Sequence, residues 1–458
     1  MRKPSLYAIS ILCVILLSLF SGLNRVQVYS VAVFSALILG TILFWRFRLA
    51  FAFTAMAVLL GTGLIDVPHL LEFAGFDIII FLAGMMIVIG YLEENRFFEI
   101  LIGKVVDFMG DDMNRLMAAL MVMGALFAAL VDEVTSILFM TSTVLHLTGR
   151  YQVNPIPYVI MLVFATNIGS SATVVGNPVG VMIALRGGLT FTDFLRWASP
   201  IAIISLMAMI PLTMKYFSRE IKVLEDLSRE YPRVEEAGGE LKAGKFAAPT
   251  MLFAATIAFL VFHHQIEELL RLEKNTMLLG TALGAAGIAL MIERDKAREI
   301  VETRVDWWTL SFFIVLFASV GTLKLTGVTS ILAGSLLSLA AGNETIFLII
   351  FILIMGILSA FMDNVLAVAT IIPVIQDLQS MGVYGFPLWW GTLFAATFFG
   401  NLTMIGSTAN IVAIGTLERR KLGHVTFLQW VKPGVMVTLP TITIAILLLL
   451  IQTPFMPR

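Results

Sequence analysis

The sequence contains little charge and few residues that could hold a metal. Charged residues make up 13% of its 458 residues, compared with about 25% in soluble proteins. The single cysteine, Cys13, excludes a disulfide framework and a thiolate metal site, and five histidines offer little to zinc. The net charge of −1 provides no basic surface for a nucleic-acid backbone. The composition therefore excludes a soluble enzyme, a disordered regulator and a nucleic-acid-binding protein.

Hydrophobic residues are what the sequence has in excess. They make up 59% of the chain, and the mean hydropathy is +0.94. Because a membrane-spanning helix needs about 20 apolar residues, we predict an all-α polytopic membrane protein. Apolar runs bounded by charges or turn residues predict membrane segments at 6–23, 28–44, 49–65, 77–92, 113–147, 157–185, 199–216, 249–265, 276–292, 306–323, 344–378, 387–416 and 434–451.

Two of these segments, 113–147 and 344–378, are too long for one crossing. Each is interrupted near its middle by an acid, Asp132 in the first and Asp363 in the second. An acid at mid-membrane costs several kcal/mol unless it has a partner or faces water. We therefore predict two re-entrant hairpins with polar tips.

Lysine and arginine gather on alternate loops. They occur at 2–3, 46–48, 96–104, 150, 215–245, 293–304 and 419–421. By the positive-inside rule these loops face the cytoplasm, which predicts about 11 spans plus two hairpins, a cytoplasmic N-terminus and an external C-terminus in the cell membrane. Residues 1–23 could instead be a signal peptide, but no clear cleavage site follows them, so we expect a retained first span.

The two halves of the chain repeat at an offset of about 230 residues. Asp77 matches Asp306, Asp132 matches Asp363, Pro157 matches Pro387, Thr173 matches Thr403, Gly176 matches Gly406, and 194–200 matches 427–433. The charge pattern predicts opposite orientations for the two repeats. Inverted repeats with broken helices are the architecture of secondary transporters, whose substrate site lies at mid-membrane between the repeats.

This repeat predicts a division of the chain into four parts. They are an extra N-terminal transmembrane helix (1–27), repeat 1 (28–217, with a hairpin at about 109–147 and a broken helix at 157–185), a cytoplasmic linker (218–248) and repeat 2 (249–458, with a hairpin at about 343–378 and a broken helix at 387–416). No GxxxxGK[ST] motif occurs, so an ATP-driven pump is not expected.

Polar residues concentrate at the hairpin tips and in the broken helices, where glycine and proline unwind the backbone. The freed carbonyls and the Ser, Thr and Asn side chains need partners that lipid does not offer, and a bound ion or hydrated substrate would supply them. The candidate ion- or substrate-binding residues are Asp132, Glu133, Thr135, Asn167, Ser170, Ser171, Thr173, Asn177, Asp363, Asn364, Asn401, Thr403, Ser407, Thr408 and Asn410. Alternatively, the aspartates only cap helices and the small residues only pack helices together.

Three motifs resemble the ion transporter superfamily over roughly residues 28–451. They are Ser359-Ala360-Phe361-Met362-Asp363-Asn364-Val365, Thr166-Asn167-Ile168-Gly169 through Gly176-Asn177-Pro178, and Gly400-Asn401-Leu402-Thr403 through Asn410. They are most similar to the branch of arsenite permeases, NhaD-type sodium/proton antiporters and the P protein. The first tip departs from that branch, with Asp132-Glu133 in place of Asp-Asn. The related dicarboxylate symporters carry Ser-Asn-Thr at each tip, which this sequence does not.

The residues and the resemblance together imply a secondary active transporter and not an enzyme. We expect it to move a small inorganic ion, Na⁺ or an arsenite-like oxyanion, coupled to a proton or sodium gradient by an elevator-type cycle. The alternative is a sodium-coupled symporter of di- and tricarboxylates such as citrate. We expect no cofactor and no metal beyond a transported or coupling Na⁺. The expected partners are the ion, the lipid bilayer and a second copy of the chain.

Overall fold

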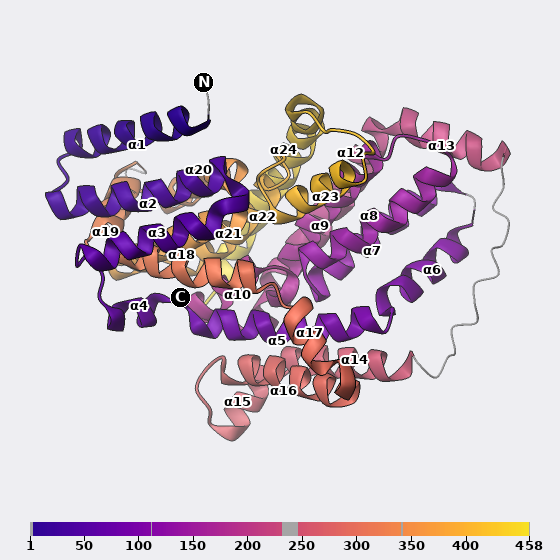
Figure 1. Cartoon of the computed structure of the whole chain (residues 1–458), viewed down its shortest axis with the longest axis horizontal. Coiled ribbons are helices and arrows are strands. Elements are labelled where there is room, and N and C mark those ends of the chain that lie inside the picture. Colours follow the sequence, from indigo (N-terminus) through magenta and orange to yellow (C-terminus); the bar gives the residue numbers. More distant parts are fainter. Residues whose placement is uncertain (1–2, 111, 231–245, 340–341, 458) are drawn as a thin grey trace.

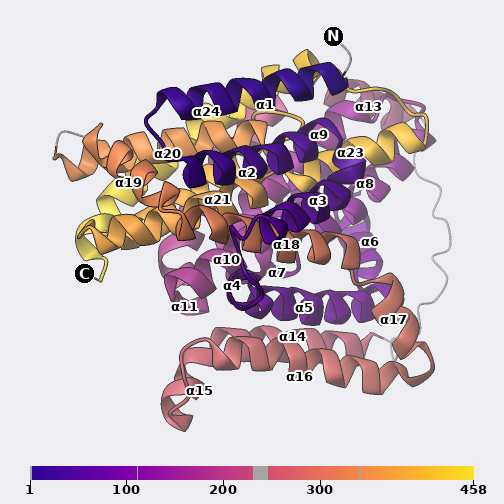
Figure 2. The same cartoon turned by 60° about the vertical axis from the view of Figure 1, so that its left-hand side comes forward.

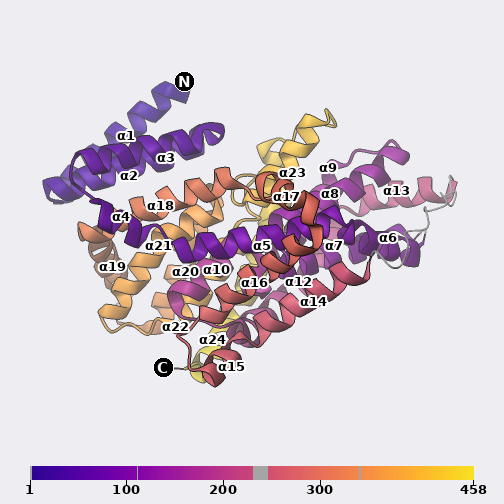
Figure 3. The same cartoon turned by 60° about the horizontal axis from the view of Figure 1, so that its bottom comes forward.

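The computed structural model describes residues 3–110, 112–230, 246–339 and 342–457. Within these residues the chain is helical, with no β-strand, which confirms the predicted all-α fold class. The helix α1 lies on one side of the molecule with α2 and α3 next to it, and α14 to α16 lie on the opposite side (Figure 1, Figure 2 and Figure 3). The remaining helices form the layer between these two sides.

The helices of the first half follow the predicted order. They are α1 (Lys3–Phe20), α2 (Arg25–Leu43), α3 (Arg48–Gly61), α4 (Val67–Phe73), α5 (Phe76–Glu94), α6 (Phe97–Met109), α7 (Met113–Leu130), α8 (Glu133–Arg150), α9 (Ile156–Gly169), α10 (Pro178–Gly187), α11 (Phe191–Asp193) and α12 (Ser199–Tyr216). Two 3₁₀ turns, Ser170–Ala172 and Val174–Gly176, separate α9 from α10. This break falls within the predicted broken helix.

The helices of the second half repeat this order. They are α14 (Ala247–Val261), α15 (His263–Leu270), α16 (Thr276–Glu293), α17 (Ala297–Thr303), α18 (Trp307–Leu325), α19 (Val328–Ser338), α20 (Glu344–Phe361), α21 (Asn364–Ser380), α22 (Phe386–Phe399), α23 (Thr408–Arg419) and α24 (Phe427–Gln452). The break between α22 and α23 corresponds to the one between α9 and α10.

The two hairpins, α7–α8 and α20–α21, extend toward opposite ends of the molecule (Figure 1). The first hairpin extends toward the end where α6 and α13 (Ser218–Glu230) lie, which we call the linker end. The second extends toward the end where α19 lies, which we call the far end. The tips therefore approach each other in the interior, next to the breaks in the two broken helices.

The hairpins and broken helices, α7–α10 and α20–α23, form what we call the central unit. Its middle consists of α9 and α22, and every side chain of α22 from Pro387 to Phe399 is buried. Helices on all sides of α22 bury it, which explains why this segment is apolar without a polar face.

The number of predicted spans is not confirmed. Nine helices in the described part of the chain are long and apolar enough to cross a membrane, or ten if one bent pair counts as a span. The expectation of about 11 spans included the two broken helices, whose halves are too short to count alone. It also included the segment 49–65, which forms only the 14 residues of α3.

The predicted span at 249–265 is bent. The chain bends by 60° between α14 and α15, at Phe262. Beyond the bend the sequence is His263-His264-Gln265-Ile266-Glu267-Glu268, which is too polar to continue through lipid. The helix therefore changes direction where the apolar run ends.

The predicted linker is partly helical. Its first residues form α13, while 231–245 lie outside the described residues. The division of the chain into an extra helix, two repeats and a linker stays a prediction, as does the placement of the N-terminus in the cytoplasm.

The close packing at the break of the first broken helix gives a prediction. A Cβ added at Gly176 would collide with the carbonyl group of Ser170. We expect Gly176→Ala to destabilise the protein by about 1–3 kcal/mol, the usual effect of overpacking. Thermal unfolding of the purified protein in detergent would measure this. Gly284→Ala in α16 is the control, because its Cβ would meet open space; equal melting temperatures for the two variants would contradict the prediction.

Candidate functional site

Each hairpin turns at an aspartate that begins its second helix. Asp132 Oδ1 accepts hydrogen bonds from the backbone N–H groups of Val134 (2.6 Å) and the next residue (3.3 Å). Asp363 Oδ1 accepts one from the backbone of Val365 (3.1 Å), and its Oδ2 accepts one from the Thr408 hydroxyl (2.5 Å). Both aspartates therefore cap a helix N-terminus, which was the alternative interpretation of these residues from the sequence.

Glu133 lies at the centre of the predicted site and is only 1% exposed. Its Oε2 accepts hydrogen bonds from the Ser170 hydroxyl (3.2 Å) and the Asn177 amide (3.4 Å). Its Oε1 accepts them from the Asn364 amide (3.2 Å) and lies 3.3 Å from the Ser407 hydroxyl. One carboxylate from the first hairpin thus contacts the first broken helix, the second hairpin and the second broken helix.

No positive side chain in the described part of the chain pairs with Glu133. Its partners are neutral amides and hydroxyls, and within the described residues it makes no ion pair. The charged groups that act on it are the carboxylates of Asp363 and Asp132. Asn364 Oδ1, an oxygen of the same cluster, is buried and accepts no hydrogen bond. Because a buried charge without a counter-charge costs several kcal/mol, this arrangement favours binding of a cation or a proton.

Asn167 joins the two broken helices. Its amide group donates to Oδ1 of Asn401 (2.8 Å) and of Asn410 (2.9 Å). Its own Oδ1 lies 3.0 Å from the Ser407 hydroxyl, which has one proton to share between Asn167 and Glu133. A continuous hydrogen-bonded network therefore connects the second broken helix to the carboxylate.

Side chains of the broken helices donate hydrogen bonds to backbone carbonyl groups of the hairpins and of the second break. The Thr173 hydroxyl donates to the carbonyl group of Ala129, and the Thr403 hydroxyl donates to that of Ala360, at corresponding positions in the two halves. The Asn410 amide donates to the carbonyl groups of Gly400 (2.7 Å) and Thr403 (2.8 Å). These bonds hold each break against its hairpin.

Two of the predicted residues serve local roles. The Ser171 hydroxyl donates to the carbonyl group of Ile168 in its own helix (2.7 Å), and Thr135 lies in the first turn of α8. Neither makes a hydrogen bond to Glu133 among the described residues. No group of three or more His, Cys, Asp and Glu side chains suited to a metal ion occurs in the described part of the chain.

Two arginines that no sequence motif indicated lie beside or within the central unit. Arg48 is buried at the start of α3, donates to the Thr309 hydroxyl (2.5 Å) and interacts electrostatically with Asp363. Arg186, in the last turn of α10, forms two hydrogen bonds with Asp77. In the sequence, both arginines stand at the boundary of an apolar segment, a position that indicates only an interface.

Comparison with known proteins identifies the family. Residues 36–395 match a family described as citrate transporters. The chain belongs to the citrate transporter family. It is 32% identical over 400 residues to a Mycobacterium tuberculosis protein named as an uncharacterized transporter, covering 84% of this chain and 90% of that one. It is 24% identical over 459 residues to the human P protein, covering 84% of this chain and 54% of that longer protein.

The fold has a counterpart among solved structures. The crystal structure of the Alcanivorax borkumensis YdaH transporter matches with a TM-score of 0.54 and 13% identity, covering 85% of this chain and 87% of that one. The resemblance to the P protein branch of the ion transporter superfamily is confirmed. This citrate transporter family member is thus a multi-pass membrane protein of a transporter family.

The Asn167 network gives a stability prediction. Asn167→Ala would leave the side-chain oxygens of Asn401 and Asn410 buried without their donor, so we expect a loss of about 1–3 kcal/mol. Ser171→Ala is the matched control, since that hydroxyl bonds only within its own helix turn. Thermal unfolding in detergent compares them. If Asn167→Ala unfolds at the same temperature as Ser171→Ala, the network does not hold the broken helices together.

Proposed function

We propose that the chain is a secondary active transporter in which Glu133 binds the coupling cation, H⁺ or Na⁺. The observation that carries this proposal is the burial of Glu133 among neutral donors, with no basic partner in the described part of the chain. A proton would neutralise the carboxylate. A sodium ion would do the same, and the unpartnered Asn364 Oδ1 would be one of its ligands.

The contacts of Glu133 with both halves support a transport role rather than a purely structural one. A cation at Glu133 would touch groups from both hairpins and both broken helices, so its arrival or loss would change the packing between the two halves. Secondary transporters with inverted repeats place their ion sites at such an interface. One charge crossing 100 mV releases about 2.3 kcal/mol, which is enough to drive a substrate uphill. We expect no enzymatic activity.

The transported substrate has two candidates. The three carboxylates at the tips, Asp132, Glu133 and Asp363, favour a small inorganic ion, because they would repel a polycarboxylate. Membership of the citrate transporter family favours citrate. In the second case the acid at Glu133 would serve the coupling cation, and the substrate would bind nearby. We propose an elevator-type movement of the central unit for both.

We predict that Glu133→Gln lowers transport to the level of empty liposomes. Glutamine retains a hydrogen-bonding oxygen and the approximate size of the side chain, but it cannot take up a proton and carries no charge for Na⁺. The measurement uses purified protein in proteoliposomes with an internal pH dye and an imposed proton gradient, to which Na⁺, Li⁺, arsenite or citrate is added. Full transport by a folded Glu133→Gln protein would refute the proposal.

Asp132→Asn is the matched control for this experiment. Asparagine caps a helix as well as aspartate does, so α8 keeps its start, and the variant removes an acid that neighbours Glu133 in the sequence. We expect Asp132→Asn to retain most of the transport. An equal loss in both variants would assign coupling to the pair of acids rather than to Glu133.

The same liposomes separate the two substrates. A pH change on adding Na⁺ or Li⁺ alone supports a cation/proton antiporter. Uptake of labelled citrate that requires a cation gradient and is lost in Glu133→Gln supports the carboxylate symporter.

A further inference from the structure

An ion pair joins the central unit to the surrounding helices at the far end. Arg186 Nη1 lies 2.6 Å from Asp77 Oδ2, and Arg186 Nη2 lies 2.8 Å from Asp77 Oδ1, so the pair is bidentate. Asp77 belongs to α5, outside the central unit, and Arg186 belongs to α10, within it. Nearby, Lys324 Nζ in α18 donates to Gln376 Oε1 in α21 (2.7 Å). All four residues line one cavity of about 480 Å³.

The second half contains a corresponding acid and arginine. Asp306 caps the N-terminus of α18 and Asp77 lies in the first turn of α5, and the two match in the sequence repeat. Arg419 corresponds to Arg186, because each stands two positions before the left-handed residue that ends its helix, Gly188 (φ 60°) or Lys421 (φ 57°).

The backbone hydrogen bonds at the two helix ends confirm this correspondence. The N–H of Leu189 donates to the carbonyl group of Ala184 (2.9 Å), and the N–H of Leu422 donates to that of Leu417 (3.0 Å). Both bonds span five residues and end at the residue after the left-handed one. The two helices therefore end in the same way, and their arginines occupy equivalent positions.

The corresponding acid and arginine are not paired with each other. Asp306 accepts hydrogen bonds from the backbone and hydroxyl of Thr309, and within the described residues it makes no ion pair. Arg419 donates to its own helix, to the carbonyl group of Gly415 (3.2 Å) and the hydroxyl of Thr416 (3.3 Å). Both side chains belong to exposed residues. The ion pair is thus made in one half and absent in the other.

The linker end contains a cavity, whereas at the far end an ion pair and a hydrogen bond join the central unit to the surrounding helices. A cavity of about 670 Å³ lies there between α5, α6 and α8. Ser142 and His146 line it and are exposed, whereas Pro373, the counterpart of Ser142 in the repeat, is buried and lines the far-end cavity. Among the described residues, no hydrogen bond or ion pair crosses this cavity from α8 to α5.

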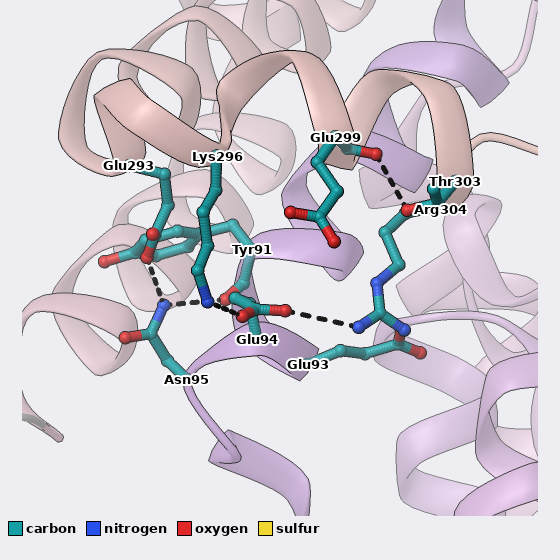
Figure 4. Close-up of polar contacts among 9 residues, drawn as sticks. All are labelled: Tyr91, Glu93, Glu94, Asn95, Glu293, Lys296, Glu299, Thr303 and Arg304. Atoms are coloured by element: carbon teal, nitrogen blue, oxygen red, sulfur yellow. Dashed lines mark hydrogen bonds and ion pairs between the residues drawn. The ribbon is translucent and has the colours of Figure 1, made fainter.

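The acids at this end of α5 are bonded to other surrounding helices instead (Figure 4). Glu93 pairs with Arg304 (3.0 Å), and Glu94 pairs with Arg304 (3.3 Å) and with Lys296. Asn95 donates to Glu293 (2.7 Å). Because these partners lie outside the central unit, these bonds do not tie the central unit to the surrounding helices at the linker end.

We propose that Asp77–Arg186 and Asp306–Arg419 are alternative ion pairs that close the far end and the linker end in turn. This inference goes beyond the proposed function and rests on its alternating movement. Inverted repeats exchange conformations between the two end states of a transport cycle, so the pair made in one half breaks as its counterpart forms. Side-chain exposures of 29% for Arg186 and 40% for Asp77 make the existing pair weak enough to break in each cycle. The present structure is the state that is closed at the far end.

Cysteine labelling tests the first pair. In a Cys13→Ser background, Ser142→Cys reports the linker-end cavity and Ile372→Cys reports the far-end cavity, in nanodiscs that expose both faces to a polar thiol reagent. Asp77→Asn removes the far-end pair. We expect it to speed labelling at residue 372 and slow it at residue 142 by about two- to fivefold, the population shift expected from loss of a half-exposed pair.

The control removes a charge from the same cavity without breaking a pair. Glu72 lines the far-end cavity and makes no ion pair in the described part of the chain, so Glu72→Gln should leave both labelling rates unchanged. Exchange of the charges, Asp77→Arg with Arg186→Asp, should restore the parent rates. Unchanged labelling in Asp77→Asn, or equal shifts in Asp77→Asn and Glu72→Gln, would overturn the proposal.

A cross-link tests the second pair. With Asp77→Asn present, Asp306→Cys and Arg419→Cys should form a disulfide on mild oxidation faster than with Asp77 intact. Arg48 is the rival partner, because it also interacts electrostatically with Asp306. If Arg48→Gln and Asp306→Asn both slow the change between the two end states while Arg419→Gln has no effect, Arg48 is the partner of Asp306. In that case the proposed exchange of ion pairs is refuted.

The labelling readout is independent of the transport site. Glu133→Gln abolishes coupling in the proposed function, whereas the labelling rates report only which end is open. A failed labelling test with an inactive Glu133→Gln variant would therefore overturn the alternative pairs and leave the proposed function intact.

Discussion

The structure depends on one constraint, which is that lipid cannot hydrogen-bond to an unwound backbone. The breaks after α9 and α22 leave carbonyl groups without a partner in the helix, and side chains bond to several of them, including Ser199 to Ala172 in the first break and Asn410 to Gly400 in the second. Thr173 and Thr403 bond to the first helix of each hairpin, and Asn410 bonds to two carbonyl groups in its own break. Asn410 also accepts a hydrogen bond from Asn167, so the residue that satisfies the second break also joins the two halves.

The carboxylate of Glu133 makes this polar interior asymmetric. Its counterpart in the repeat is Asn364, and the two side chains bond to each other, so an acid and an amide meet at the pseudo-symmetric centre. Two acids there would repel, and two amides would carry no charge to respond to a cation. The ion pair at the far end is the second departure from symmetry. Each departure makes the two repeats differ at positions where exact symmetry would make them equivalent.

Much of the fold and part of the site could be predicted from the sequence. Apolar run lengths, acids at mid-segment and the internal repeat placed the hairpins and broken helices, because the period and length of apolar runs reflect the membrane directly. The bend before His263 and the short α3 were missed, because both depend on which residue lies where the apolar segment reaches the membrane surface. The roles of the tip residues were not separable, since aspartate and glutamate at a helix start have the same local pattern.

The sequence by itself determined that this chain is a helical membrane protein, where its helices break, and which polar residues gather at the breaks. These follow from composition and spacing, which the bilayer constrains residue by residue. Only the tertiary structure decided that Asp132 and Asp363 cap helices while Glu133 is enclosed by both halves. It also decided that Arg186 pairs with Asp77 while Arg419 and Asp306 stay apart. The Arg186–Asp77 and Glu133–Asn364 contacts join residues more than 100 positions apart, and their formation depends on the packing of whole helices, which no local pattern records.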